Sequence, residues 1–100
     1  MMAKYFFTNK AVADLTKIYE YTYEFWSEKQ ADKYYQEIID YCQFLSENPN
    51  LGKNYQEIKS ELYGFVANKH IIFYRILGKL EIEVVRILGA EMDLKNRLKD

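Results

Sequence analysis

Few side chains in this 100-residue chain could transfer protons or attack a substrate. His70 is the only histidine, and its ordinary pKa near neutrality would suit a proton shuttle. A general base also needs an orienting group, and none stands at a recognisable spacing, so we favour a histidine at a strand start held by a backbone hydrogen bond. Cys42 is the only cysteine, and its mid-helix place on an apolar face predicts a buried structural residue.

The same counts exclude several kinds of site. One cysteine and one histidine cannot form a structural zinc site, which takes about four such ligands, and a single cysteine cannot form an internal disulfide. We therefore expect no metal, no cofactor and a cytoplasmic location. The first residues lack an apolar stretch after Lys4, and no run approaches the roughly 18 apolar residues of a membrane span, so we expect no membrane association.

Charge gives little support to nucleic-acid binding. The net charge is −1, with both signs mixed along the chain, so we expect no direct sequence-specific binding to nucleic acid. Among the cations, Arg86 stands out because simple alternation places it on the buried face with Ile82 and Val84. A bulge at Val84 and Val85, or a partner such as Asp93, would avoid burying an unpaired charge. Arg86 then either meets a target or forms a structural fork with a carboxylate.

The elements that must position these residues follow from local signals. Thr8 and Ser27 are placed to cap two helices, the second of which must end before Pro49. Alternating apolar residues after Tyr63 predict a meander of strands with a two-residue turn at Gly78 and Lys79. The expected elements are a strand at 4–8, helices at 9–26 and from 28, strands at 63–67, 70–77 and 80–88, and a short helix at 93–99.

This order predicts a single α+β domain over residues 1–100. An N-terminal strand and an antiparallel helical hairpin pack on one face of a small antiparallel β-sheet, and a short C-terminal helix closes the chain.

The first helix carries two apolar stripes. Core-facing spacing selects Ala11, Leu15, Ile18, Thr22 and Phe25, whereas Asp14 and Lys17 should lie away from the core. The second stripe consists of Val12, Tyr19, Tyr23 and Trp26. It either packs against the second helix and a loop or receives an apolar segment of a partner protein.

Three stretches together resemble the ParE branch of the RelE/ParE toxin superfamily: KAVADLTKIYEYTYEFW, NPNLGK, and HIIFYRI followed by VVRILGAEMD. The resemblance implies a toxin of a type II toxin–antitoxin system that inhibits DNA gyrase by binding, is not an enzyme, and is neutralised by a cognate ParD-like antitoxin. The second stripe would bind the antitoxin. The target-binding residues would be Arg75, Arg86, Glu91, Met92 and Asp93.

Two other functions stay open. Ribonuclease members of the superfamily cut ribosome-bound messenger RNA with a tyrosine or histidine near the C-terminus, and this chain has neither after Tyr74. Members of the family commonly carry a histidine and an arginine in the segment that here reads Gly89 and Glu91. A degenerate toxin that only binds antitoxin is therefore the second alternative.

Overall fold

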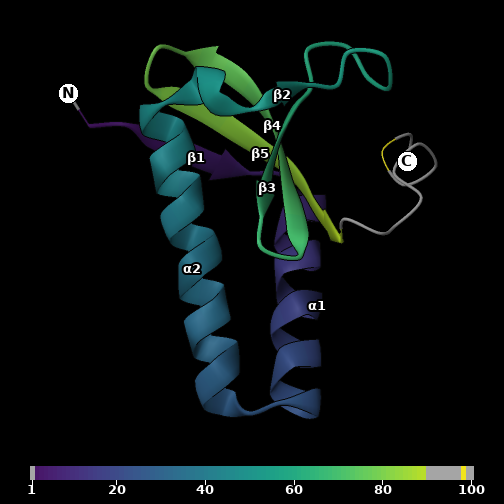
Figure 1. The fold of residues 1–100 in the computed structure, drawn as a ribbon. Helices are drawn as coiled ribbons and strands as arrows, with labels where there is room; N and C mark the ends of the chain where they lie inside the picture. Colours follow the sequence, from purple (N-terminus) through teal and green to yellow (C-terminus); the bar gives the residue numbers. More distant parts are fainter. Residues whose placement is uncertain (1, 90–97, 99–100) are drawn as a thin grey trace.

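The protein is an α+β domain of two layers, a helical hairpin against one face of a five-stranded sheet (Figure 1). The computed structural model describes residues 2–89 and residue 98. The helices are α1 (Asn9–Phe25) and α2 (Glu28–Glu47), followed by the 3-10 turn η1 (Pro49–Leu51). The strands are β1 (Lys4–Phe7), β2 (Lys53–Asn54), β3 (Tyr63–Ala67), β4 (His70–Gly78) and β5 (Glu81–Gly89).

The helix ends lie within one residue of their predicted places. The Thr8 hydroxyl accepts from the Ala11 backbone N–H at 3.1 Å, and the Ser27 hydroxyl accepts from the Gln30 backbone N–H at 3.0 Å. Both contacts satisfy N–H groups that a helix start leaves without partners. Pro49 follows the last turn of α2, as its fixed backbone requires.

The sheet is mixed, which corrects the expectation of a purely antiparallel one. Its order is β1-β5-β4-β3-β2, and β1 pairs parallel with β5, while the other neighbours are antiparallel. The two-residue turn between β4 and β5 is also displaced by one residue. Gly78 pairs with Glu81, so the loop is Lys79 and Leu80 and not Gly78 and Lys79.

A β-bulge interrupts the β4–β5 ladder at Val85, which is one of the two arrangements that the sequence left open for Arg86. Phe73 lies opposite Arg86 and Tyr74 opposite Val84, which leaves Val85 without a partner residue. The Thr8 hydroxyl donates to the Val85 carbonyl oxygen at 2.8 Å, so the start of α1 is fastened to the bulge.

Apolar side chains cover both faces of the sheet. The cluster between sheet and helices includes Leu15, Ile38, Leu45, Ile72 and Ile87. The opposite face carries a smaller cluster, in which the loop before β3 contributes Leu62 and the sheet contributes Phe73 and Leu88. Leu98 joins this second cluster and is helical and 2% exposed. The rest of the helix expected at 93–99 lies outside the described residues.

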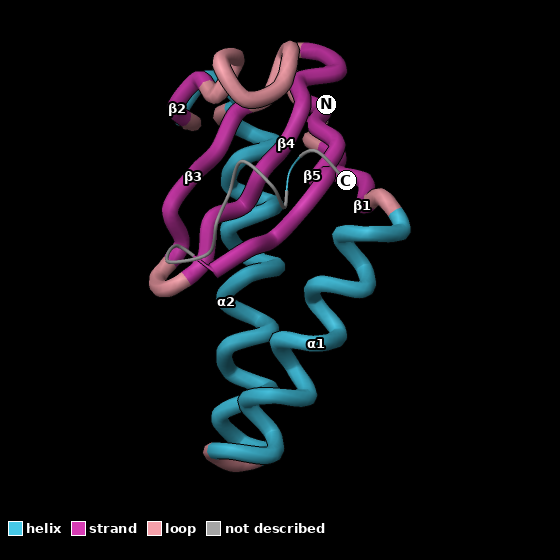
Figure 2. The backbone as a smooth tube through the Cα atoms, turned by 90° about the vertical axis from the view of Figure 1, so that its right-hand side faces the viewer, coloured by secondary structure: helices cyan, strands magenta, loops and turns pink. Residues whose placement is uncertain are grey.

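The hairpin is longer than the sheet is wide, and its closed end projects past the strands (Figures 1 and 2). Phe25 is 64% exposed there, so its predicted place in the core is wrong. The prediction for Asp14 is wrong in the opposite direction: the helical pattern placed it toward solvent, but it is only 8% exposed. The partner that permits this burial lies on β5.

Candidate binding groove

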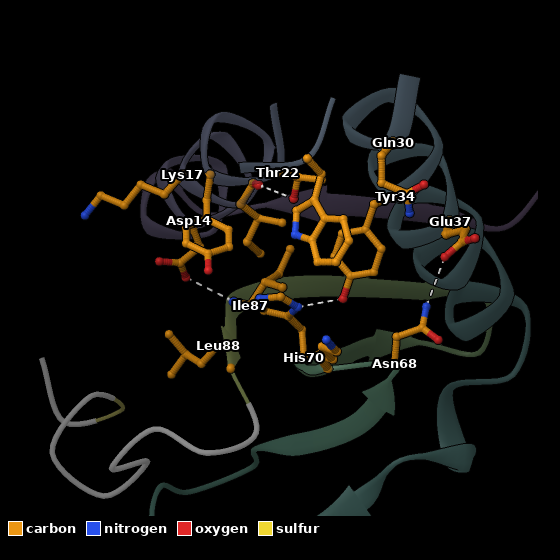
Figure 3. Close-up of a pocket in the computed structure, with 15 residues that line it drawn as sticks. Asp14, Lys17, Thr22, Gln30, Tyr34, Glu37, Asn68, His70, Ile87 and Leu88 are labelled. Carbon is orange, nitrogen blue, oxygen red and sulfur yellow. Dashed lines mark hydrogen bonds between the residues drawn. The ribbon is translucent and has the colours of Figure 1, made fainter. Parts of the chain in front are cut away.

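A groove of about 960 Å³ lies between the helical hairpin and the adjoining ends of β4 and β5 (Figure 3). We call it the hairpin groove. Three elements line it: α1, α2 and the sheet end with the β3–β4 turn. Its lining residues on the helices are Asp14, Lys17, Ile18, Tyr21, Thr22, Trp26, Gln30, Tyr34 and Glu37, and those on the sheet side are Asn68, Lys69, His70, Ile87, Leu88 and Gly89.

A buried ion pair joins one helical wall of the groove to the sheet. Arg86 Nε donates to Asp14 Oδ2 at 2.7 Å, and Arg86 Nη2 donates to Asp14 Oδ1 at 3.0 Å. The Ile87 backbone N–H also donates to Asp14 Oδ2, at 3.0 Å. The side chains are 9% and 13% exposed, so this two-armed contact lies largely out of water. It fixes α1 against the bulged part of β5.

The imidazole of His70 lies on the sheet side of the groove, beside Tyr34 of α2 (Figure 3). His70 Nδ1 and the Tyr34 hydroxyl are 2.6 Å apart. Its hydrogen-bond partner is therefore a side chain and not the backbone group that the sequence suggested. Burial lowers the pKa of His70 below its ordinary 6.5, so the ring is neutral near pH 7. Burial raises the pKa of Tyr34, and a hydrogen bond from the Lys69 backbone offsets part of that rise.

The other charged side chains of the groove differ in their contacts. Glu37 Oε2 accepts from Asn68 Nδ2 at 3.0 Å, which links α2 to the β3–β4 turn. Lys17 and Lys69 stand on opposite sides, on α1 and on that turn, and both are exposed. Neither ammonium group forms an ion pair with any residue that the structure describes.

The residues predicted to bind a partner segment fall into two places. Trp26 lines the hairpin groove and is 70% exposed. Val12 and Tyr23 are exposed outside the groove lining. Tyr19 packs toward α2 instead, where its hydroxyl donates to Asp32 Oδ1 at 2.6 Å and its ring meets Tyr35 edge to face. The second stripe of α1 is therefore not one continuous surface.

The residues predicted to bind a target are also separated. Arg75 makes loose ion pairs with Glu61 at 3.7 Å and Glu83 at 3.9 Å on the exposed surface. Arg86 forms a two-armed fork with Asp14, and the suggested partner Asp93 lies outside the described residues. Glu91, Met92 and Asp93 lie outside the described residues.

Cys42 has no access to the groove. It is completely buried on α2, and burial raises the pKa of its thiol to about 12. Such a thiol is almost never ionised at neutral pH and is a poor nucleophile. In the described part of the chain, no group of three or more histidine, cysteine, aspartate or glutamate side chains is placed to hold a metal. No described helix combines the length and the apolar composition that crossing a bilayer requires.

The groove residues that the sequence analysis missed include Asp14, Tyr34 and Lys69. Asp14 was predicted as a solvated residue, because helical periodicity reports only burial. The need of Arg86 for a carboxylate was recognised, and that need was the one signal that could have led to Asp14.

The chain is similar to known proteins over nearly its whole length. Residues 5–94 match the family model described as the ParE toxin of type II toxin-antitoxin system, parDE. The chain is 33% identical over 98 residues to Toxin ParE1 of Mycobacterium tuberculosis, covering 98% of this chain and 100% of that one. It is 26% identical to Toxin ParE1 of Caulobacter vibrioides over 97 residues, covering 97% and 99%.

A solved structure, the chromosomal ParDE TA system from P. aeruginosa, has the same fold. It aligns with a TM-score of 0.75 at 26% identity and covers 90% of this chain and 98% of that chain. The similarity therefore extends to the hairpin and to the sheet that together form the groove.

Proposed function

Because this chain belongs to the ParE toxin family of type II toxin–antitoxin systems, we propose that it inhibits DNA gyrase by binding and is neutralised by a cognate ParD-like antitoxin. In this proposal it acts in the cytoplasm through protein contacts, without metal or cofactor. The observation that carries the proposal is the hairpin groove, an apolar concave surface rimmed by exposed aromatic side chains.

The groove suits an antitoxin segment of helical or extended form. Its walls are rigid elements, and Ile18, Ile87 and Leu88 give it an apolar lining. Tyr21 and Trp26 at its rim are 60% and 70% exposed, and aromatic side chains of this kind are typical anchors of protein interfaces. We therefore place the main antitoxin contact at Trp26. Val12 and Tyr23 would join only if the segment continues round α1, and Tyr19 would support that face from beneath.

The target-binding residues that we propose are Arg75, Arg86, Glu91, Met92 and Asp93. Arg75 is suited to an intermolecular contact because it is exposed and both of its carboxylate partners are more than 3.5 Å away, so that exchanging them costs little. Arg86 would act differently. Its guanidinium already holds Asp14, so it would position the end of β5 for the target.

Two features favour binding over catalysis. The buried Cys42 thiol is un-ionised near neutral pH, and the chain has neither a tyrosine nor a histidine after Tyr74, the residue types that ribonuclease members use near the C-terminus. RNA cleavage would need a general acid or base with access to the 2′-hydroxyl.

Expression without antitoxin tests the proposed target. We expect slowed growth with DNA-damage signalling and loss of plasmid supercoiling, while ribosome-bound messages stay intact. Codon-specific cleavage of those messages with normal supercoiling would instead support the ribonuclease alternative. Normal growth together with tight antitoxin binding would support the degenerate toxin.

A pair of matched variants tests the antitoxin contact. Trp26→Ala should weaken antitoxin binding by roughly thirty-fold or more, since an anchor residue contributes at least about 2 kcal/mol. Val66→Ala is the control, because Val66 is 61% exposed on β3 outside the groove lining, and it should change the affinity by less than about three-fold. Equal affinity of Trp26→Ala and the parent, both folded by circular dichroism, would move the antitoxin surface elsewhere.

A further inference from the structure

The two carboxylates of the hairpin groove differ in their partners. Asp14 accepts from the Arg86 guanidinium and from the Ile87 backbone N–H, so a positively charged partner would have to compete with Arg86 for it. Glu37 accepts one hydrogen bond from the neutral amide of Asn68.

The two lysines of the groove form no ion pair with the described residues. Lys17 and Lys69 are exposed on opposite walls. In Figure 3 the Lys17 side chain extends from α1 past Asp14 and outward from the groove. Two ammonium groups flanking an apolar lining attract carboxylates from both sides of a bound segment.

His70 adds a polar ring nitrogen between those walls. Its Nδ1 lies 2.6 Å from the Tyr34 hydroxyl, which leaves Nε2 for a bound segment. Nε2 has no hydrogen-bond partner within the described residues. Every buried side-chain nitrogen and oxygen in that part of the chain does have a partner, so Nε2 must be accessible to solvent. Gly89 lies directly opposite His70 in the sheet register and places no side chain over the ring.

From this arrangement we propose that the hairpin groove selects an acidic amphipathic segment, with apolar side chains over Ile18, Ile87 and Leu88 and carboxylates toward Lys17 and Lys69. The proposal rests on the antitoxin role given above to the groove, and it defines the chemistry of the antitoxin segment that binds there. Lys17 and Lys69 are then specificity residues: they favour an acidic segment and reject a basic one of equal apolarity.

The test uses two designed helical peptides with the same leucine stripe, one with glutamate and one with lysine on its polar face. Binding to the full chain is followed by the fluorescence of Trp26, which is the only tryptophan and lies in the groove. We expect the glutamate peptide to bind roughly ten-fold more tightly, with a preference that shrinks as salt is raised.

Charge reversal makes the test specific to the groove. The double variant Lys17→Glu with Lys69→Glu should remove or reverse the preference for the glutamate peptide. Its control is Lys59→Glu with Lys79→Glu, which changes net charge equally at exposed positions outside the groove lining and should keep the preference.

Equal binding of both peptides, or an unchanged preference in the groove double variant, would overturn the proposal. Displacement of the glutamate peptide by a single-stranded RNA of equal charge would also overturn it, because the groove would then recognise negative charge on phosphates in general. None of these results would remove the antitoxin role, which fails only if the cognate antitoxin itself does not bind.

Discussion

Removing the buried ion pair of Asp14 and Arg86 should cost the fold a large part of its stability. The substitution Asp14→Ala leaves a guanidinium that is only 13% exposed and a backbone N–H at Ile87, a residue 2% exposed, without their shared acceptor. Removing one partner of a buried ion pair costs about 3–5 kcal/mol. We take this range to include the Ile87 N–H, since a buried N–H that loses its acceptor costs about 1–3 kcal/mol by itself. A domain of this size has about 5–15 kcal/mol in total.

Urea unfolding followed by circular dichroism measures the loss. With a slope of about 2 kcal/mol per molar urea, a loss of about 4 kcal/mol lowers the midpoint by about 2 M. Glu61→Ala is the matched control, because it removes a carboxylate from an exposed ion pair with Arg75 whose side chains are 47% and 75% exposed. That change should cost no more than about 1 kcal/mol.

A double-mutant cycle then separates the pair from its surroundings. Asp14→Leu combined with Arg86→Met should be less destabilising than the sum of the two single changes, with a coupling of about 2 kcal/mol, because the double variant removes both members of the ion pair. The reasoning is refuted if Asp14→Ala costs no more than Glu61→Ala, or if the two single effects simply add.

Three further outcomes follow from the buried polar groups. Burial lowers the pKa of His70 below 6.5, so the free energy of unfolding should be highest above about pH 6.5 and should fall as the pH drops toward the folded-state pKa. Urea titrations at about pH 7.5 and about pH 5.5 measure this difference, and His70→Gln should make it smaller. The Cys42 thiol, with its pKa raised to about 12, should resist a thiol reagent until urea unfolds the chain, and rapid labelling of the native protein would contradict its burial. Gly52→Ala should destabilise by roughly 1–3 kcal/mol, because the new Cβ would lie 2.4 Å from the Tyr74 hydroxyl that Gly52 N–H donates to; an unchanged melting temperature would show that Tyr74 moves freely.

Features encoded by neighbouring residues could be predicted from the sequence. Thr8, Ser27 and Pro49 act within three or four residues, and they set the helix ends within one residue. The cost of burying Arg86 unpaired suggested either a bulge or a carboxylate partner, and the structure has both, with the extra residue at Val85 and the carboxylate of Asp14. Local chemistry of this kind does not depend on how the elements assemble.

Features that depend on distant contacts were missed. Asp14 and its partner Arg86 are 72 residues apart, so the helical pattern alone assigned this carboxylate to solvent. Phe25 fits the core stripe by spacing, but the hairpin extends beyond the sheet at that point. Gly78 has no positive φ in the structure, so the backbone freedom that made it a turn candidate is not used there. The parallel pairing of β1 with β5 also joins segments about 77 residues apart, which local patterns do not report.

Gyrase supercoiling in the presence of this protein and its antitoxin tests the central claim most directly. Purified toxin titrated into a supercoiling reaction should inhibit it, and one equivalent of the cognate ParD-like antitoxin should restore it, whereas ribosome-bound messenger RNA incubated with the same toxin should stay whole. Undiminished supercoiling at a large molar excess of folded toxin, or cleavage of the messenger RNA, would contradict the account.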